Sequence, residues 1–465
     1  AATLLAALVL LTDSRGTVFA FGVSAAVLLA LLPGRNRRAW LLLAVLAALA
    51  VAWGPLTDVT QALAPRQFAP ADQTVQRGAE WSLLIAAGVG VAWGLGRWAV
   101  ASLSDRSPGL AINLPRVSAA LLCGVVLAGA VAAAVAVKDP VGRFSDQYNA
   151  FTELEPTDKG SRFTSGGGNR YDYWRIAWKQ FTAHPLNGIG AGNFDRTYFL
   201  ERRTKEDVRQ AHSIELQTLG DTGIVGALAL GSFLVAVFAG FWRRAAAARR
   251  HGSELGLTVA AAGIFAVWLA QTSVDWLHLI PGVTGIALGA GAVLLSRAGP
   301  TAGESRLWPL PPLGTAVVLI LAVVAIVFIG RPTLADRLRS EAQDQVESQP
   351  AKALESVDES LSLNSEAVQS YYIKAAALAR LGAYRPSVDA LTEAIRREPH
   401  NYVSWALLGD LATRRGDVSG AMRAYGRASS LNPRDRELRL LSSRRRLVER
   451  LREHPAAVAP LLGSG

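Results

Sequence analysis

Long apolar blocks, separated by short polar segments, occupy most of the first 330 residues of this chain. A helix needs about 20 mostly apolar residues to cross a bilayer, and fewer when its flanking groups reach the interface. By that criterion the pattern predicts about nine membrane spans: Ala1–Leu11, Thr17–Leu32, Ala39–Trp53, Glu80–Gly96, Val117–Val137, Ile224–Trp242, Leu255–Ser273, Pro281–Leu295 and Gly314–Ile329. The first block is too short to cross and the chain begins without Met, so we expect missing N-terminal spans.

One long polar segment, Lys138–Asp221, interrupts this apolar pattern. Its charges and free backbone groups would be unsatisfied in hydrocarbon, so the segment must stand at a membrane face. We expect chemistry in this loop because it carries arginines, several glycines and His212.

Composition and charge place the chain in the membrane class. Hydrophobic residues make up 51% of the sequence, and the mean hydropathy is +0.24. The net charge of +11 does not imply a nucleic-acid partner, because arginines gather in alternate short loops and excess Lys/Arg marks cytoplasmic loops. The cytoplasmic set is Arg35, Arg37, Arg38, Arg97, Arg106, Arg116, Arg243, Arg244, Arg249, Arg250, Arg297 and Arg306, against Arg15, Arg66 and Arg77 opposite. The polar loop and the C-terminal region are therefore predicted to face outward.

The region after Ile329 is polar and repetitive. Small and bulky residues there recur with the period of about 34 residues that is typical of tetratricopeptide repeats. One repeat shows Trp405, Leu408, Gly409, Gly416, Ala421, Tyr425, Ala428 and Pro433, and the repeat before it Tyr371, Gly382, Leu391, Ala394 and Pro399. We predict a membrane domain over residues 1–330 and a tetratricopeptide domain over 331–465, with clear repeats over about 368–433. The array is either a spacer or a docking surface for a protein partner, and the Arg-rich stretch Leu438–Leu451 is expected to be a solvated closing helix.

Metal and nucleotide sites are not indicated. The six histidines are scattered, and no pair has helical ligand spacing, so no metal site or cofactor is predicted. The run Gly188-Ile-Gly190-Ala-Gly192 lacks the third glycine of a nucleotide-binding loop and follows no strand. Tight turns are its favoured role, with phosphate binding as the alternative.

Several residues remain as candidates for chemistry. Arg15 stands at the outer end of a span, where it is either an interfacial anchor or a functional cation. Arg170 and Arg175 lie on an expected amphipathic helix, where surface ion pairs, with Asp172 as a partner, are the alternative role. His212 begins a short helix entering the next span, where a neutral imidazole is able to accept a proton. Asp275 is one helical turn from His278. The two either line the same cavity as His212 or serve helix packing near the interface.

Five motifs in order carry a resemblance to a known family. They are Ser14-Arg15-Gly16, Arg170-Tyr-Asp-Tyr-Trp174, the run from His184 to Gly192, Ala211-His212-Ser213 and Gly223-Ile-Val-Gly226. Together they resemble the O-antigen ligase and polymerase superfamily, over most of Ala1–Leu295. The family's His is commonly followed by Asn, whereas Ser213 follows here, and its members have more spans.

The resemblance implies an all-α, polytopic membrane bundle of the GT-C-like glycosyltransferase type in the bacterial cytoplasmic membrane, followed by a soluble α-solenoid. It implies transfer of a polyprenyl-diphosphate-linked glycan to a glycan or lipid-glycan acceptor, with Arg15, Arg170 and His212 as catalytic residues. Arg175, Gly188, Gly190 and Asp275 are weaker candidates for substrate binding. Two other classes stay open, a lipid-linked sugar transporter and a non-catalytic membrane anchor that displays the repeats. The almost charge-free spans count against the transporter.

Overall fold

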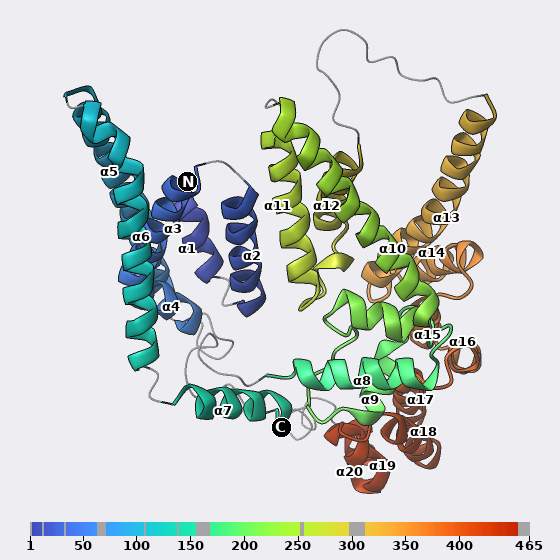
Figure 1. Cartoon of the computed structure of the whole chain (residues 1–465). Helices are drawn as coiled ribbons and strands as arrows, with labels where there is room; N and C mark the ends of the chain where they lie inside the picture. The colour runs from blue at the N-terminus through green and yellow to red at the C-terminus, as the bar shows by residue number, and fades with distance from the viewer. Residues whose placement is uncertain are drawn as a thin grey trace. The chain divides into compact units, whose positions relative to one another are not determined.

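The computed structural model describes residues 2–11, 14–31, 34–62, 71–106, 108–136, 139–154, 168–251, 255–296 and 312–453. Every regular element in these ranges is a helix, which confirms the all-α prediction (Figure 1). Of the predicted loop residues, Arg66, Lys138, Arg297 and Arg306 lie outside the described ranges.

The chain forms two compact units. Unit 1 comprises Ala1–Phe194 and Arg209–Pro300, and unit 2 comprises Asp195–Val208 and Thr301–Gly465. This division differs from the predicted one in two places. The last apolar helix groups with the repeats, and a short piece of the polar loop, Asp195–Val208, also belongs to the repeat unit.

Unit 1 holds the apolar helices, and each predicted span before residue 300 overlaps one of them. Its helices are α1 (Ala2–Leu11), α2 (Arg15–Leu31), α3 (Arg35–Val51), α4 (Trp53–Ala62), α5 (Ala71–Arg106), α6 (Pro108–Ala136), α7 (Pro140–Thr152), α8 (Arg170–Ala183), α10 (Ile214–His251), α11 (Leu255–Thr272), the 3-10 helix η1 (Leu277–Leu279) and α12 (Pro281–Leu295). Helix α11 packs against α2, α10 and α12 and is the most enclosed of the long apolar helices (Figure 1).

The length of these helices limits which can cross a membrane alone. Within the described ranges, α5, α10 and α11 contain windows long and apolar enough to span, and α3 with α4 would make a fourth span bent by 65°. Shorter apolar helices are α1, α2, Arg116–Gly129 in α6 and α12. The expectation of about nine crossings is therefore supported only in part, because the described ranges hold three helices of spanning length, or four with the bent pair.

One predicted cytoplasmic loop is in fact helical. Helix α10 continues through His251, so Arg243 and Arg244 lie on its last turns. Arg244 is buried, and it donates to the Thr258 hydroxyl (Nε–Oγ1, 3.1 Å) and the Ser296 hydroxyl (Nη1–Oγ, 2.7 Å). This arginine therefore links α10 to the start of α11 and the end of α12, and protein oxygens accept hydrogen bonds from its guanidinium.

In the described ranges, unit 2 contains most of α9 (Phe194–Glu201), then α13 (Pro312–Gln345) and seven further helices. These are α14 (Pro350–Leu363), α15 (Val368–Arg380), α16 (Tyr384–Arg397), α17 (Tyr402–Arg415), α18 (Val418–Leu431), α19 (Arg436–Ser443) and α20 (Arg445–Glu453). Helix α13 pairs with α14, α15 with α16, and α17 with α18. Helix α15 begins at Val368 and α17 at Tyr402, an offset of 34 residues that agrees with the sequence period. A Cβ on Gly409 would lie 2.7 Å from the Tyr425 ring, so the small and bulky positions of the repeat pack directly on each other.

The C-terminal stretch is not one solvated helix. It forms α19 and α20, and Leu438, Leu441, Leu447 and Val448 are buried against α18 and Tyr425. The two helices cover the apolar end of the array, as a terminal repeat must.

Candidate active site

His212 occupies a constrained position directly before α10. Its φ of +54° lies in the left-handed region, which costs most residues roughly 1–2 kcal/mol but is several-fold enriched in His, Asn and Asp. The next residue, Ser213, caps the helix, since its hydroxyl accepts from the Leu216 N–H (3.4 Å) and donates to Glu215 (2.9 Å). Ser and Asn are about equally good N-caps, so Ser213 fills a role that Asn would also fill.

Glu215 then fixes this helix start to the end of α11. Its second carboxylate oxygen accepts from the Ser273 hydroxyl at 2.6 Å. Because Ser273 is followed by Val274 and Asp275, the same contact brings the loop after α11 to His212.

Arg170 and Asp275 meet His212 within hydrogen-bonding distance. Arg170 Nη2 donates to Asp275 Oδ2 at 3.0 Å, and Nη1 donates to the Val274 carbonyl. His212 Nδ1 lies 3.1 Å from Asp275 Oδ1 and 3.1 Å from Arg170 Nη1. The backbone N–H of Trp276 also donates to Asp275 Oδ1, at 2.9 Å. Asp275 is therefore the group that joins the predicted arginine to the predicted histidine.

These contacts favour one tautomer of His212. A guanidinium has no acceptor, so Nδ1–H donating to Asp275 satisfies the carboxylate while Arg170 donates to Asp275 and Val274. This leaves the Nε2 lone pair free to accept a proton. The Tyr173 ring packs beside the imidazole, with centroids 5.2 Å apart, and restricts its rotation.

Asp275 is ionised at neutral pH. Burial alone would raise its pKa, but the hydrogen bond from His212, the charge of Arg170 and the Trp276 N–H together outweigh burial and lower the pKa to about 2. A fixed negative charge beside the imidazole stabilises the protonated ring that would form during proton transfer.

His278 lies near this group without sharing its role. It is on the 3-10 helix η1, after Asp275, so the two do not stand one turn apart on a regular helix as expected. Its Nδ1 is buried without a hydrogen-bond partner, and burial lowers the pKa of His278, which keeps the ring neutral.

Arg15 stands next to Gly16, which lies against the end of α11 and Val274. It is exposed and begins α2. A Cβ on Gly16 would lie 2.9 Å from Gln271 Nε2 and 3.1 Å from a Val274 methyl group, so α2 begins against the residues that lead to Asp275. The structure thus joins Arg170, His212 and Asp275 directly and places the start of α2 beside Val274.

Arg175 has a structural partner. Its Nη2 donates to Asp172 Oδ1 at 2.7 Å, and the Asp172 side chain is fully buried. The ion pair with Asp172, the alternative role for Arg175, is therefore present, but it is not a surface pair, because this carboxylate is enclosed and needs the arginine for neutralisation. The aromatic face of α8 is partly covered, since Phe151 of α7 packs edge-on against Tyr171 and Trp174.

Gly188 and Gly190 allow the loop to pack closely on α10, near the break in that helix at Gly223. Gly188 and Gly190 have φ of +67° and +91°, which confirms their predicted role in turns. A Cβ on Gly188 would lie 2.4 Å from the Asp221 and Thr222 backbone. The break is at Gly223, with φ +64°. Ile189 and Gly190 donate to the Gly220 and Asp221 carbonyls, both at 2.9 Å. These contacts account for glycine at both positions, and their contribution to substrate binding remains a prediction.

Sequence reasoning did not find the Ser213–Glu215–Ser273 contacts or Gln271. Gln271 is buried near the end of α11, and its Oε1 has no hydrogen-bond partner. A polar residue in an apolar span was the available signal, since such residues often mark functional sites in membranes.

A comparison with protein families matches residues 73–231 to the model of the O-antigen ligase family. No curated protein matches the chain. The matched segment includes Arg170 and His212, whereas Arg15 and Asp275 lie outside it.

Proposed function

We propose that this chain, whose residues 73–231 match the model of the O-antigen ligase family, transfers a polyprenyl-diphosphate-linked glycan to an acceptor hydroxyl. The match supports a role in ligation or polymerisation of surface polysaccharide. The contact of Arg170, Asp275 and His212 is the observation that carries the chemistry, because it provides a base, its orienting carboxylate and a cation in one place.

In the proposed reaction, Nε2 of His212 takes the proton of the acceptor hydroxyl. The acceptor oxygen then bonds to the anomeric carbon of the donor sugar as the bond from that carbon to the diphosphate oxygen breaks. The leaving polyprenyl diphosphate gains negative charge. Arg170, whose side chain is 35% exposed, and Arg15 would stabilise that charge with guanidinium N–H groups, so that no metal is needed.

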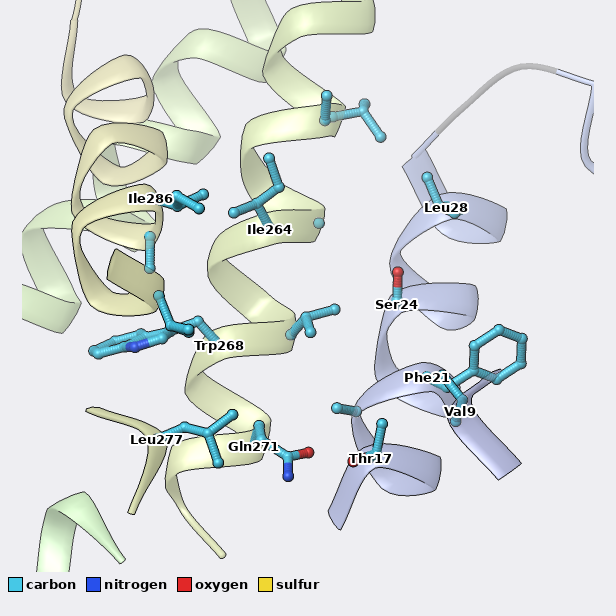
Figure 2. Close-up of a pocket in the computed structure, with 17 residues that line it drawn as sticks. Val9, Thr17, Phe21, Ser24, Leu28, Ile264, Trp268, Gln271, Leu277 and Ile286 are labelled. Atoms are coloured by element: carbon cyan, nitrogen blue, oxygen red, sulfur yellow. The ribbon is translucent and has the colours of Figure 1, made fainter. Parts of the chain in front are cut away.

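An apolar cavity in unit 1 provides a place for the prenyl chain. It has a volume of about 660 Å³ and lies between α2, α11 and α12. Figure 2 shows Phe21 and Leu28 on one side and Ile264, Trp268 and Ile286 on the other. Gln271 and Thr17 mark one end, which is the end nearest Gly16 and Val274. A lipid with an apolar tail and a polar head fits this distribution of side chains.

Filling this cavity should weaken donor binding. Ile264→Trp is expected to raise KM for a long-chain prenyl donor about tenfold, because the larger side chain would fill space that the prenyl chain needs, and tenfold corresponds to about 1.4 kcal/mol. The kcat value should change less than about twofold, since the reacting groups are untouched. Initial rates with purified donor in detergent would measure both constants.

Leu288→Trp is the matched control for this variant. Leu288 is exposed on α12 and does not line the cavity. An unchanged KM in Ile264→Trp, or an equal rise in both variants, would exclude this cavity as the donor site.

We also propose a membrane orientation and a role for the C-terminal repeats. The arginine distribution supports an outward-facing active loop at the bacterial cytoplasmic membrane. The helical pairs with their 34-residue offset support a tetratricopeptide domain, which is able to present a docking surface for a protein partner.

A deletion strain complemented with this protein would test the function. Wild type should restore long surface glycans on a gel, and a variant with Arg15, Arg170 and His212 all replaced by alanine should not. Accumulated lipid-linked polymer in the variant indicates a ligase, and free short units indicate a polymerase. Full restoration by the variant would favour a non-catalytic membrane anchor.

A further inference from the structure

A piece of the active-site loop is held by the repeat unit. The loop belongs to unit 1 up to Phe194, whose carbonyl accepts from Gln180 Nε2 at 2.9 Å. Residues Asp195–Val208 belong to unit 2, and the chain returns to unit 1 at Arg209. His212 follows Val208 by only four residues.

Arg202 makes the central contact in this held segment. Its side chain is 3% exposed, and its Nη2 donates to Asn432 Oδ1 at 2.8 Å. Asn432 is itself fully buried at the end of α18. Arg434 then donates from Nε to the Arg202 carbonyl at 2.7 Å. A buried, charge-assisted hydrogen bond backed by a second bond to the same residue is a specific contact.

Two further contacts extend the docking surface along the repeats. Phe199 packs edge-on against Tyr402, with ring centroids 4.9 Å apart. Arg196 Nη2 lies 2.7 Å from Glu398 Oε1 in an ion pair of which each side chain is about one quarter exposed. The repeat residues involved come from α17 and from the turns beside α16 and α18.

The segment is also closed by its own contacts. Arg202 Nη1 donates to the Glu206 carbonyl at 2.7 Å and to Asp207 at 2.5 Å. The Tyr198 hydroxyl, which is buried, donates to the same Glu206 carbonyl at 3.0 Å. The segment therefore presents a folded surface to the repeats and not a loose strand.

We propose that the repeat unit acts as an intramolecular clamp for residues 195–208 and thereby positions His212. The docking surface consists of Glu398, Tyr402, Asn432 and Arg434, and its occupant is the chain's own loop. The clamp limits the motion of the segment that leads into His212, whose left-handed backbone needs support from its surroundings. The effect on catalysis rests on the proposed function, whereas the clamp itself does not.

Charge reversal across the ion pair tests the clamp. Arg196→Glu and Glu398→Arg would each place like charges opposite one another. Backbone amides of residues 195–208 should then exchange with solvent at least about tenfold faster, as local opening becomes easier. The double variant should exchange more slowly than Glu398→Arg alone, although Asn401, which donates to Glu398, loses its partner in both.

A second variant tests the contact between Arg202 and the distant residue Asn432. Asn432→Ala removes the acceptor of the buried Arg202 guanidinium, and an unpaired buried donor is costly. Exchange within 195–208 should rise in this variant as well. Lys205→Glu is the control, because Lys205 is exposed in the same segment and only its carbonyl contacts Arg202.

The two parts of the proposal fail separately. Unchanged exchange of residues 195–208 in Asn432→Ala and in both charge reversals would overturn the clamp. Faster exchange with wild-type kcat for glycan transfer would overturn the positioning of His212. Absence of transfer by the wild-type protein would refute the proposed function, while the exchange rates would still decide the clamp.

Discussion

His212→Asn should reduce glycan transfer by roughly 10²–10⁴-fold, the range that a positioned general base contributes. Asparagine tolerates the left-handed backbone that His212 adopts, so this variant removes the proton acceptor without straining the loop. His212→Ala would lose the same chemistry but also add a backbone cost of roughly 1–2 kcal/mol. Single-turnover transfer from a lipid-linked donor, with purified protein, would measure the loss directly.

The control for this loss is His400→Ala. His400 is exposed in the turn between α16 and α17, so its removal should leave both transfer and the melting temperature unchanged. A His212→Asn protein that folds, binds donor and transfers glycan at the wild-type rate would refute the role of His212 as the base. Lower transfer together with a lower melting temperature would instead indicate structural damage.

The helices of the fold were predictable because apolar blocks and a repeat period are local signals. The breaks were less so. Gly223 interrupts α10 at the point where Gly188 approaches the helix backbone, and this approach joins segments that are far apart in sequence. The glycines indicated turns, but their partner in α10 could not be read from spacing.

In the candidate active site, too, local motifs were predictable and contacts between distant segments were not. The arginine and histidine could be chosen from motifs, and the structure places Arg170 Nη1 3.1 Å from His212 Nδ1. Asp275 was only a weak candidate, because nothing near it in sequence shows that the loop after α11 folds back to His212. The contact between Arg202 and Asn432 spans 230 positions, and neither residue belongs to a motif. Such tertiary contacts depend on how the helices pack.

Arg170→Lys is the second variant with a large expected effect. Lysine keeps the positive charge but lacks the planar fork of N–H groups. The wild-type guanidinium binds Asp275 Oδ2 and the Val274 carbonyl at once, which holds the carboxylate that orients His212. Loss of one well-placed donor to developing charge typically costs about 10²–10³-fold in kcat, and we expect that loss here.

A double variant separates the two roles of Arg170. If Arg170 acts only by holding Asp275, then adding Arg170→Lys to Asp275→Asn should cost nothing further in kcat. If Arg170 also neutralises the departing diphosphate, the second change should cost an additional factor of about ten or more. Arg209→Lys, an exposed position in the same loop, is the control and should transfer glycan like the wild type. We expect the additional loss, because the Arg170 side chain remains 35% exposed despite its contacts and is therefore accessible to a substrate.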